Sequence, residues 1–130
     1  MLDQKTEVDM ACRAVMDRFM EALNRHDVNT METCTHFPHF RFTGDQAKVY
    51  DAPGSNPMDL FKRLQEEDDW LYSAWRTRDL VQFDARRAHY AVSYTRYRSD
   101  HSVIGVYESL YVLARIDGKW GIQARSSFGP

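Results

Sequence analysis

The chain has 130 residues, of which 43% are hydrophobic and 28% charged, and its formal net charge is −2 at pH 7. This size and composition are typical of one globular domain with a single hydrophobic core, and they exclude a disordered or fibrous chain. Lysines and arginines are scattered along the sequence rather than gathered in a basic stripe. We therefore expect no binding to nucleic acid.

Secretion, membrane insertion and disulfide bonding are also disfavoured. The opening MLDQKTEVDM is polar and acidic, unlike a secretion signal, and no apolar stretch has membrane-spanning length. We therefore expect a cytoplasmic protein without membrane contact. Cys12 and Cys34 are too few and too far apart for a disulfide framework or a thiolate metal site, so each is expected to be a small buried group.

The first part of the chain predicts helices. Apolar residues recur at intervals of three and four from Val8 to Leu23, which is the pattern of an amphipathic helix of about five turns. Val28 and Met31 predict a second, shorter helix after a break at Asp27.

Alternating phenylalanines in HFPHFRF predict a strand over residues 36–42, because Pro38 is not tolerated inside a helix. The sequence TGD then turns the chain. A third helix is predicted over residues 55–67, with Asn56 as its N-cap and Pro57 in its first turn.

In the second half of the chain the hydrophobic period changes to two. Four strands are predicted over residues 70–83, 88–98, 103–116 and 119–128. The sequences DARR, SDHS and DGK are the turns, and the Asp-Gly pair of DGK is typical of a tight hairpin. Helices followed by an antiparallel meander predict one α+β domain over residues 1–130, in which a curved antiparallel sheet packs on three helices.

Three stretches carry a resemblance to a known family: RFMEALNRHD in the first helix, FPHFRF in the first strand and DGKWGIQARSSF at the last hairpin. With the order of elements, they resemble the nuclear-transport-factor-2-like superfamily, which includes ketosteroid isomerases and SnoaL-like polyketide cyclases, and within it a bacterial group of unassigned function. The resemblance implies a cone-shaped, cystatin-like fold with a pocket on the concave side of the sheet. It also implies that a second subunit commonly meets the convex side.

The chemistry of the isomerases does not carry over. The resemblance puts Phe19 where that family has an oxyanion-binding tyrosine, Thr43 where it has a catalytic aspartate, and Val112 near its second oxyanion acid. A phenyl ring, a neutral hydroxyl and an isopropyl group supply neither a proton acceptor nor a hydrogen bond to a developing enolate. Steroid-type isomerisation is disfavoured, although these positions stay part of the expected ligand pocket.

Strand alternation and the resemblance together assign side chains to the two faces of the sheet. The last strand is expected to turn Trp120, Ile122, Ala124, Ser126 and Phe128 inward, and Lys119, Gln123 and Arg125 outward. The two strands before it are expected to turn Tyr90, Val92, Tyr94, Arg96, Val106, Glu108, Leu110 and Val112 inward. Trp70 and Trp75 have opposite parity, and the register favours Trp75 as the one that faces the pocket.

Hydroxyl-bearing and aromatic residues are expected on the convex face, where they favour a homodimer interface over open water. They are Ser93, Thr95, Tyr97, Tyr107, Ser109, Tyr111 and Leu113. A solvated, tyrosine-rich face is the alternative.

His36 and His39 are an odd number of residues apart in a strand, so they emerge from opposite faces and cannot bind one metal ion together. We expect neither a metal site nor a cofactor. The expected register turns His39, Arg41 and Thr43 toward the pocket.

Three of the expected pocket residues each have two interpretations. Glu108, among aliphatic neighbours, is either a pocket acid or base or one partner of a salt bridge near the end of the sheet. His39 is either a proton shuttle or a hydrogen-bonded wall residue. Arg41 either grips a ligand carboxylate or pairs with an acid such as Glu108.

Three functions are compatible with the sequence. The first is binding of a small, largely apolar molecule whose acidic group is held by Arg41. The walls of that pocket would be Trp75, Tyr90, Tyr94 and Phe128. The second is a cofactor-free isomerase, cyclase or dehydratase with His39 and Glu108 as acid and base. The third is a dimerising scaffold without chemistry in its cavity.

Overall fold

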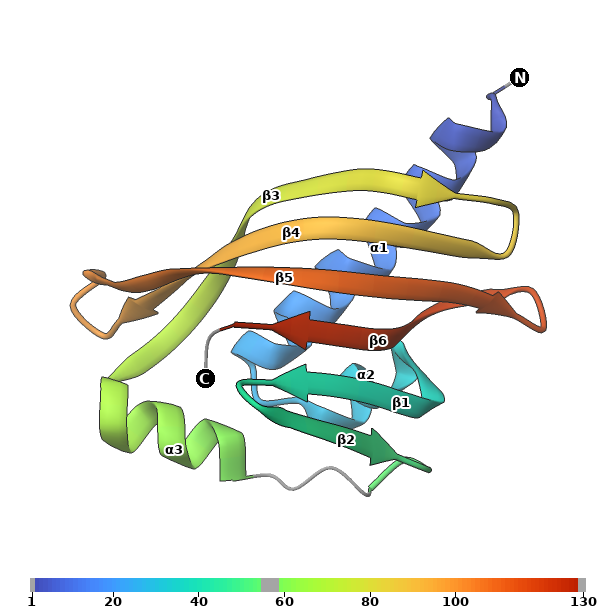
Figure 1. The fold of residues 1–130 in the computed structure, drawn as a ribbon. Helices are drawn as coiled ribbons and strands as arrows, with labels where there is room; N and C mark the ends of the chain where they lie inside the picture. Colours follow the sequence, from blue (N-terminus) through green and yellow to red (C-terminus); the bar gives the residue numbers. More distant parts are fainter. Residues whose placement is uncertain (1, 55–58, 129–130) are drawn as a thin grey trace.

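The computed structural model describes residues 2–54 and 59–128, without the side chains of residues 59, 60, 62 and 63 (Figure 1). Three helices pack on one curved six-stranded sheet with the strand order β2-β1-β6-β5-β4-β3. The predicted α+β architecture is therefore confirmed. The elements are α1 (Gln4–Asn24), α2 (Val28–Thr33), β1 (Thr35–Thr43), β2 (Gln46–Tyr50), α3 (Asp59–Asp68), β3 (Trp70–Phe83), β4 (Arg87–Arg98), β5 (Val103–Ile116) and β6 (Lys119–Ser127).

The sheet is mixed rather than purely antiparallel. β1 and β6 run parallel, whereas the other neighbouring strands are antiparallel. The meander of β3 to β6 was predicted correctly, but β1 joins its β6 edge in the same direction as β6. β2 then folds back along β1. It was not predicted, because its residues are mostly exposed and lack an apolar alternation.

Helix α1 lies across the concave side of the sheet (Figure 1). Asp3 caps its first turn by accepting a hydrogen bond from the Thr6 N–H at 2.7 Å. The stripe predicted from the three-and-four spacing is buried and forms much of the hydrophobic core. Leu23, the last residue of the predicted stripe, is partly buried, and Met16 and Met20 are buried beside the stripe; the buried members are Val8, Cys12, Val15, Phe19 and Ala22. No helix in the described part of the chain is long and apolar enough to cross a membrane.

Two polar contacts hold the C-terminal half of α1 against β3. The Asn24 amide donates to the Ser73 carbonyl and accepts from the Ser73 N–H, both at 2.8 Å. The indole N–H of Trp75 donates to the Met16 carbonyl at 3.2 Å. These contacts set the spacing between helix and sheet around the site described below.

The two short helices pack on different elements, α2 against α1 and α3 against β3. α2 begins after Asp27, whose carboxylate caps it. On α3, Phe61 stacks on Trp70 with ring centroids 6.2 Å apart, so the helix is held by an aromatic contact to the first residue of β3. The N-cap predicted for this helix, Asn56, and the following Pro57 lie outside the described residues.

The inward face of β5 is the opposite of the predicted one. Tyr111 pairs with Tyr90 and Tyr107 pairs with Tyr94, and directly paired residues share a face of the sheet. Glu108 therefore points to the convex side. Both faces of β5 carry apolar side chains, so alternation alone could not identify the inner one. The inward set is Tyr107, Ser109, Tyr111 and Leu113, and the outward set is Val106, Glu108, Leu110 and Val112.

A β-bulge changes the phase of β6. Gln123 is an extra residue relative to β5, between the pairs made by Ile122 and Ala124. Ile122 faces inward as predicted, but beyond the bulge Arg125 faces inward where Ala124 was expected to. Phe128, also expected inward, is 82% exposed.

A bulge on β3 corrects the prediction for the two tryptophans. The register with β4 shifts between Trp70 and Tyr72, so Leu71 is an extra residue. As a result Trp70 and Trp75 both face the concave side, although their parity differs. The expectation that only one would do so was wrong.

Candidate functional site

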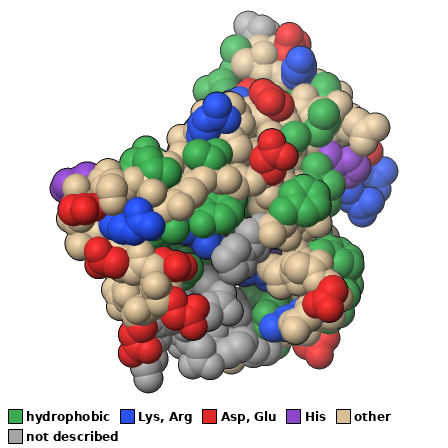
Figure 2. All heavy atoms as spheres, turned by 60° about the vertical axis from the view of Figure 1, so that its left-hand side comes forward, with side chains coloured by type: hydrophobic (Ala, Val, Ile, Leu, Met, Phe, Trp, Pro, Cys, Tyr) green, Lys and Arg blue, Asp and Glu red, His purple; other side chains and the backbone are tan. Residues whose placement is uncertain are grey.

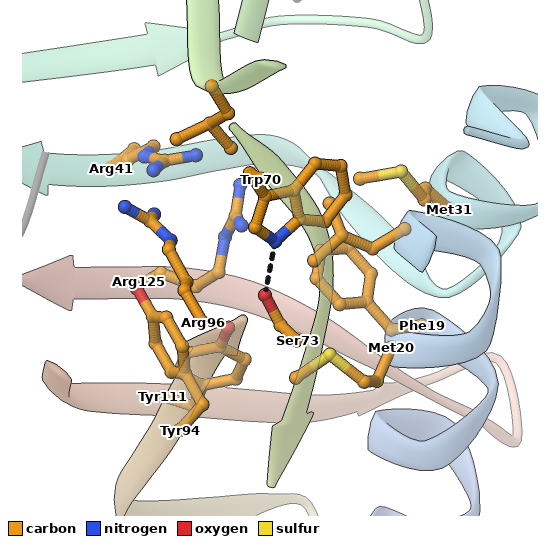
Figure 3. A pocket seen from close by; sticks show the side chains of 12 residues that line it. Phe19, Met20, Met31, Arg41, Trp70, Ser73, Tyr94, Arg96, Tyr111 and Arg125 are labelled. Carbon is orange, nitrogen blue, oxygen red and sulfur yellow. Dashed lines mark hydrogen bonds between the residues drawn. The ribbon is translucent and has the colours of Figure 1, made fainter. Parts of the chain in front are cut away.

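A cavity lies between α1 and the concave side of the sheet (Figure 3). Its volume is about 40 Å³, which is room for about three water molecules. One wall is apolar and consists of Phe19, Met20, Leu23, Met31, Leu64 and Trp70. The other carries hydroxyl and guanidinium groups and consists of Arg41, Ser73, Tyr94, Arg96, Tyr111 and Arg125.

Arginines from three strands meet at the polar wall. Arg41 of β1 and Arg125 of β6 are direct partners in the parallel ladder, so their side chains leave the sheet side by side. Figure 3 shows their guanidinium groups facing one another, with that of Arg96 close by. None of the described side chains that line the cavity is acidic. Neither Arg41 nor Arg125 forms a salt bridge with a described carboxylate.

The two adjacent cations repel each other. The charge of Arg125, followed by burial, lowers the pKa of Arg41 from its ordinary value of 12.5 to about 10, despite an opposing effect of nearby tyrosines. Arg41 is still protonated at neutral pH. The polar wall is therefore a positively charged surface in a partly dry space, which is where an anion is bound most strongly.

His39 lies behind these arginines and is 3% exposed. Its Nδ1 is 3.2 Å from the Ile122 carbonyl, and its Nε2 is 3.1 Å from Nε of Arg125. A carbonyl only accepts and a guanidinium only donates, so the proton is on Nδ1 and Nε2 accepts from Arg125. Burial, then the charge of Arg125, lowers the pKa of His39 to about 3. His39 is a neutral acceptor that orients Arg125.

Aromatic rings support the other sides of the arginines. The guanidinium carbon of Arg125 lies 5.2 Å from the ring centroid of Phe19. That of Arg96 lies 4.5 Å from the centroid of Tyr107 and 5.7 Å from that of Tyr94. Such contacts stabilise a guanidinium group without neutralising it. Phe19 therefore helps to hold Arg125 in place while its charge is kept.

Trp70, the largest side chain of the apolar wall, directs no polar group into the cavity. The indole N–H of Trp70 donates to the Ser73 hydroxyl at 3.0 Å, which leaves the ring carbons to line the space (Figure 3). Trp70 is 2% exposed. A bound molecule would thus meet cations on one side and hydrocarbon on the other.

Four of the predicted site residues are at or beside this cavity. Arg41, Phe19 and Tyr94 line it, and His39 supports it from behind. Thr43 follows on the same strand, half-buried and paired with Ser127, and is not a lining residue.

Predicted site residues on β5 and β6 lie elsewhere. Glu108 and Val112 point to the convex side because of the β5 register, and Glu108 is exposed. Phe128 is in solvent because of the β6 bulge. His39 and Glu108 therefore do not converge on one cavity, as the predicted acid–base pair requires.

Two predicted wall residues face inward but pack away from the cavity. Tyr90 is fully buried and its hydroxyl donates to Asp9 on α1 at 2.7 Å. Burial raises the pKa of this phenol. Trp75 packs edge-on against Tyr111 with ring centroids 5.5 Å apart. Tyr90 is part of the core, and Trp75 is partly buried and packs against it.

Sequence reasoning missed Arg125 and Tyr111 as cavity residues and placed both on the convex face. The cause is the phase of β6 and β5, which is set by a bulge and by the pairing of whole strands. No local pattern around Arg125 distinguishes it from a solvated arginine.

No group of three or more described histidine, cysteine, aspartate or glutamate residues could hold a metal ion. The two histidines of β1 have separate partners: Nε2 of His36 lies 2.8 Å from the Lys119 carbonyl, whereas His39 contacts Ile122 and Arg125.

The fold is shared with several bacterial proteins of known structure. An NTF2-like protein with a cystatin-like fold from Novosphingobium aromaticivorans superposes with a TM-score of 0.76 at 11% identity, over 96% of this chain and 83% of that one. A protein of unknown function with a cystatin-like fold from Nostoc punctiforme gives 0.74 at 12%, over 92% and 89%. A ketosteroid isomerase-like protein from Erwinia carotovora gives 0.65 at 18%, over 93% and 96%.

No protein-family model matches the sequence, and no curated protein matches it. The chain has the cystatin-like, nuclear-transport-factor-2-like fold that its sequence predicted. At these identities the likeness extends to the fold and not to the activity.

Proposed function

We propose that the protein binds a small anionic molecule in the cavity between α1 and the sheet. The observation that carries this proposal is the meeting of Arg41 and Arg125 at a polar wall where no described lining side chain is acidic. The positive charges of the two arginines would attract an anion. The bidentate geometry of guanidinium suits carboxylate and phosphate oxygens.

The size of the cavity favours a compact charged group over a bulky apolar one. About 40 Å³ is far less than the several hundred Å³ of a pocket that encloses a whole drug-sized ligand. The group that enters would be the size of a carboxylate or a phosphate, and any larger remainder of the molecule would extend toward the mouth. Of the small, largely apolar molecule that the sequence suggested, only the acidic group is therefore proposed to enter the cavity.

Acid–base catalysis has weaker support. Glu108 points away from His39, and the low pKa of His39 leaves it neutral and engaged with Arg125. A histidine that gains a proton only below about pH 3 is a poor proton donor or acceptor near neutral pH. The proposal is therefore one of binding, without an assigned reaction.

A thermal-shift screen tests the proposal. Acetate, benzoate, sulfate and phosphate are added at constant ionic strength, with chloride as the reference. We expect at least one of them to raise the melting temperature by several degrees, because a ligand that binds the folded state stabilises it by mass action.

Arg41→Ala should abolish this rise. Arg18→Ala, which removes an exposed arginine of α1, is the matched control and should retain it. Equal shifts in both variants, or no shift with any anion, would reject anion binding at this cavity.

We further propose that two copies of the chain associate through the convex side of the sheet. Large apolar side chains remain exposed there by 38–56%, although the face differs from the predicted tyrosine-rich one. We call them the convex band: Phe40, Phe42, Val49, Val106 and Leu110. A two-fold dimer would bury this band against the same band of a second copy and so remove its apolar side chains from water.

A further inference from the structure

We propose that the pair Arg41 and Arg125 selects a compact oxyanion with two negative charges, such as a phosphate monoester, over anions with one. This inference rests on the proposed function and names the class of ligand. It concerns the same cavity but adds a preference for two negative charges over one, which anion binding by itself does not require.

The charge balance of the site supports a dianion. Arg41 and Arg125 are neighbours in the ladder and carry one positive charge each, while His39, whose Nε2 accepts from Arg125, is neutral. A monoanion would leave one of these charges without compensation in a partly dry space. A dianion neutralises both and removes their mutual repulsion.

Shape supports the same class. Two guanidinium groups that face one another across a small space present donors to different oxygens of one group (Figure 3). A tetrahedral oxyanion has enough oxygen atoms to accept from both forks, whereas a carboxylate has two. The cavity volume of about 40 Å³ suits such a headgroup.

No described residue that lines the cavity carries a carboxylate that could pair with the arginines in place of a ligand. Among the residues that the structure describes, the titratable or charged groups near the pair are His39 on β1, Tyr50 on β2, Tyr94 and Arg96 on β4, and Tyr111 on β5. Exposed carboxylates gather instead around α3, as Figure 2 shows, and include Glu66, Glu67 and Asp69. They disfavour anions in general, so affinity for the site depends on the arginine pair.

The pH dependence of binding provides the sharpest test. A phosphate monoester loses its second proton with a pKa of about 6. Between pH 5 and 7.5 His39 stays neutral and Arg41 stays charged. A change in affinity over this range that a singly charged control ligand does not share therefore comes from the titration of the phosphate monoester. His26 is exposed beside Trp70 and lies outside the cavity. An effect of this histidine on anion binding would also be seen with the control ligand.

The experiment is calorimetric titration of the whole protein with methyl phosphate, sulfate and methanesulfonate at constant ionic strength. Methanesulfonate is tetrahedral and carries one charge at every pH used. We expect the affinity for methyl phosphate to rise about tenfold from pH 5 to 7.5, as the dianionic fraction rises. Sulfate and methanesulfonate should show no such rise, and methanesulfonate should bind at least about tenfold more weakly than methyl phosphate at pH 7.5.

Arg41→Gln should remove the preference for methyl phosphate over methanesulfonate, whereas Arg41→Lys, which keeps the charge, and the control Arg18→Gln should retain it. Equal affinities for the two ligands at pH 7.5 in the unsubstituted protein would overturn the dianion inference and leave anion binding standing. No binding of any of the three ligands would overturn both.

Discussion

His39 illustrates how the function of one residue is set by its two hydrogen-bond partners. Its ring is buried, and each nitrogen already has a role, as donor to Ile122 or as acceptor from Arg125. Protonation would place an N–H of the ring against an N–H of the guanidinium. The residue type suggests proton transfer, but its surroundings favour a fixed support for Arg125.

Because His39 is buried in its neutral form, the free energy of unfolding is expected to fall in acid. The pKa of His39 is about 3 in the folded protein and about 6.5 in an unfolded chain. Between these values the unfolded chain binds a proton that the folded protein does not. The stabilising contribution is therefore complete above about pH 6.5 and is lost as the pH falls, by up to about 1.4 kcal/mol per pH unit.

Urea unfolding at pH 7 and pH 5 measures this effect. The free energy of unfolding should decrease by about 2 kcal/mol more in the unsubstituted protein than in His39→Gln. The ring signals of His39 in NMR spectra should not titrate above pH 4.5. A titration midpoint near pH 6 would contradict the buried, neutral assignment.

The acceptor at position 39 should also matter for binding. His39→Leu leaves Nε of Arg125 without its partner, whereas His39→Gln can supply an amide oxygen. We expect the leucine variant to lose about 0.5–1.5 kcal/mol of affinity for methyl phosphate and the glutamine variant to recover most of it. The measurement is calorimetric, and equal losses in two folded variants would show that His39 does not act as an acceptor.

At the scale of elements, the structure depends on a few tertiary contacts between well-formed helices and strands. The hairpin between β5 and β6 is local: Asp117 and Gly118 have φ of 52° and 76°, as a tight turn of the Asp-Gly type requires. The joint between α1 and β3 is not local, because the Asn24 amide pairs with the backbone of Ser73, which is 49 residues away.

The contact between Asn24 and Ser73 can be tested by replacing one atom of the amide, its nitrogen, by oxygen. Asn24→Asp replaces the amide donor by a second oxygen, which would face the Ser73 carbonyl. The free energy of unfolding should decrease by about 1–3 kcal/mol, measured by urea unfolding at pH 7. Asn29→Asp, on the exposed side of α2, is the matched control and should change it by less than about 0.5 kcal/mol. Similar losses in both variants would show that the joint contributes nothing specific.

At the scale of the whole molecule, the two faces of the sheet have different properties. The concave face encloses the core and the arginine-lined cavity, and the convex face carries the convex band. Two chains joined through the band would keep both cavities free, since these lie on the opposite side of each sheet. Dimerisation and anion binding are therefore expected to be independent of each other.

Analytical ultracentrifugation tests the dimer. We expect the protein to sediment at twice its chain mass of 15.3 kDa, and Phe42→Lys to sediment as a monomer because a charge at the centre of an apolar interface is costly. Met10→Lys replaces an apolar side chain of α1 that is 59% exposed, against 48% for Phe42, and should remain a dimer. A monomeric unsubstituted protein would exclude the proposed association.

Much of the fold could be predicted because its signals are local. The spacing of apolar residues identified α1, the alternation identified β3 to β6, and Asp-Gly identified the last hairpin. β2 was missed because an exposed edge strand needs no apolar alternation. The parallel pairing of β1 with β6 was missed because it joins residues far apart in the chain.

The site was predicted only in part, and the reason is physical. The sequence alone predicted the helices and every strand except β2, and strand alternation, with the family resemblance, placed His39 and Arg41 on the inward face. Tertiary structure decided which residues meet them: one extra residue at Gln123 brought Arg125 into the cavity, and the pairing of β5 exchanged Glu108 for Tyr111. Side chains alternate with a period of two, so a shift of one residue, which only strand pairing can specify, reverses every face beyond it.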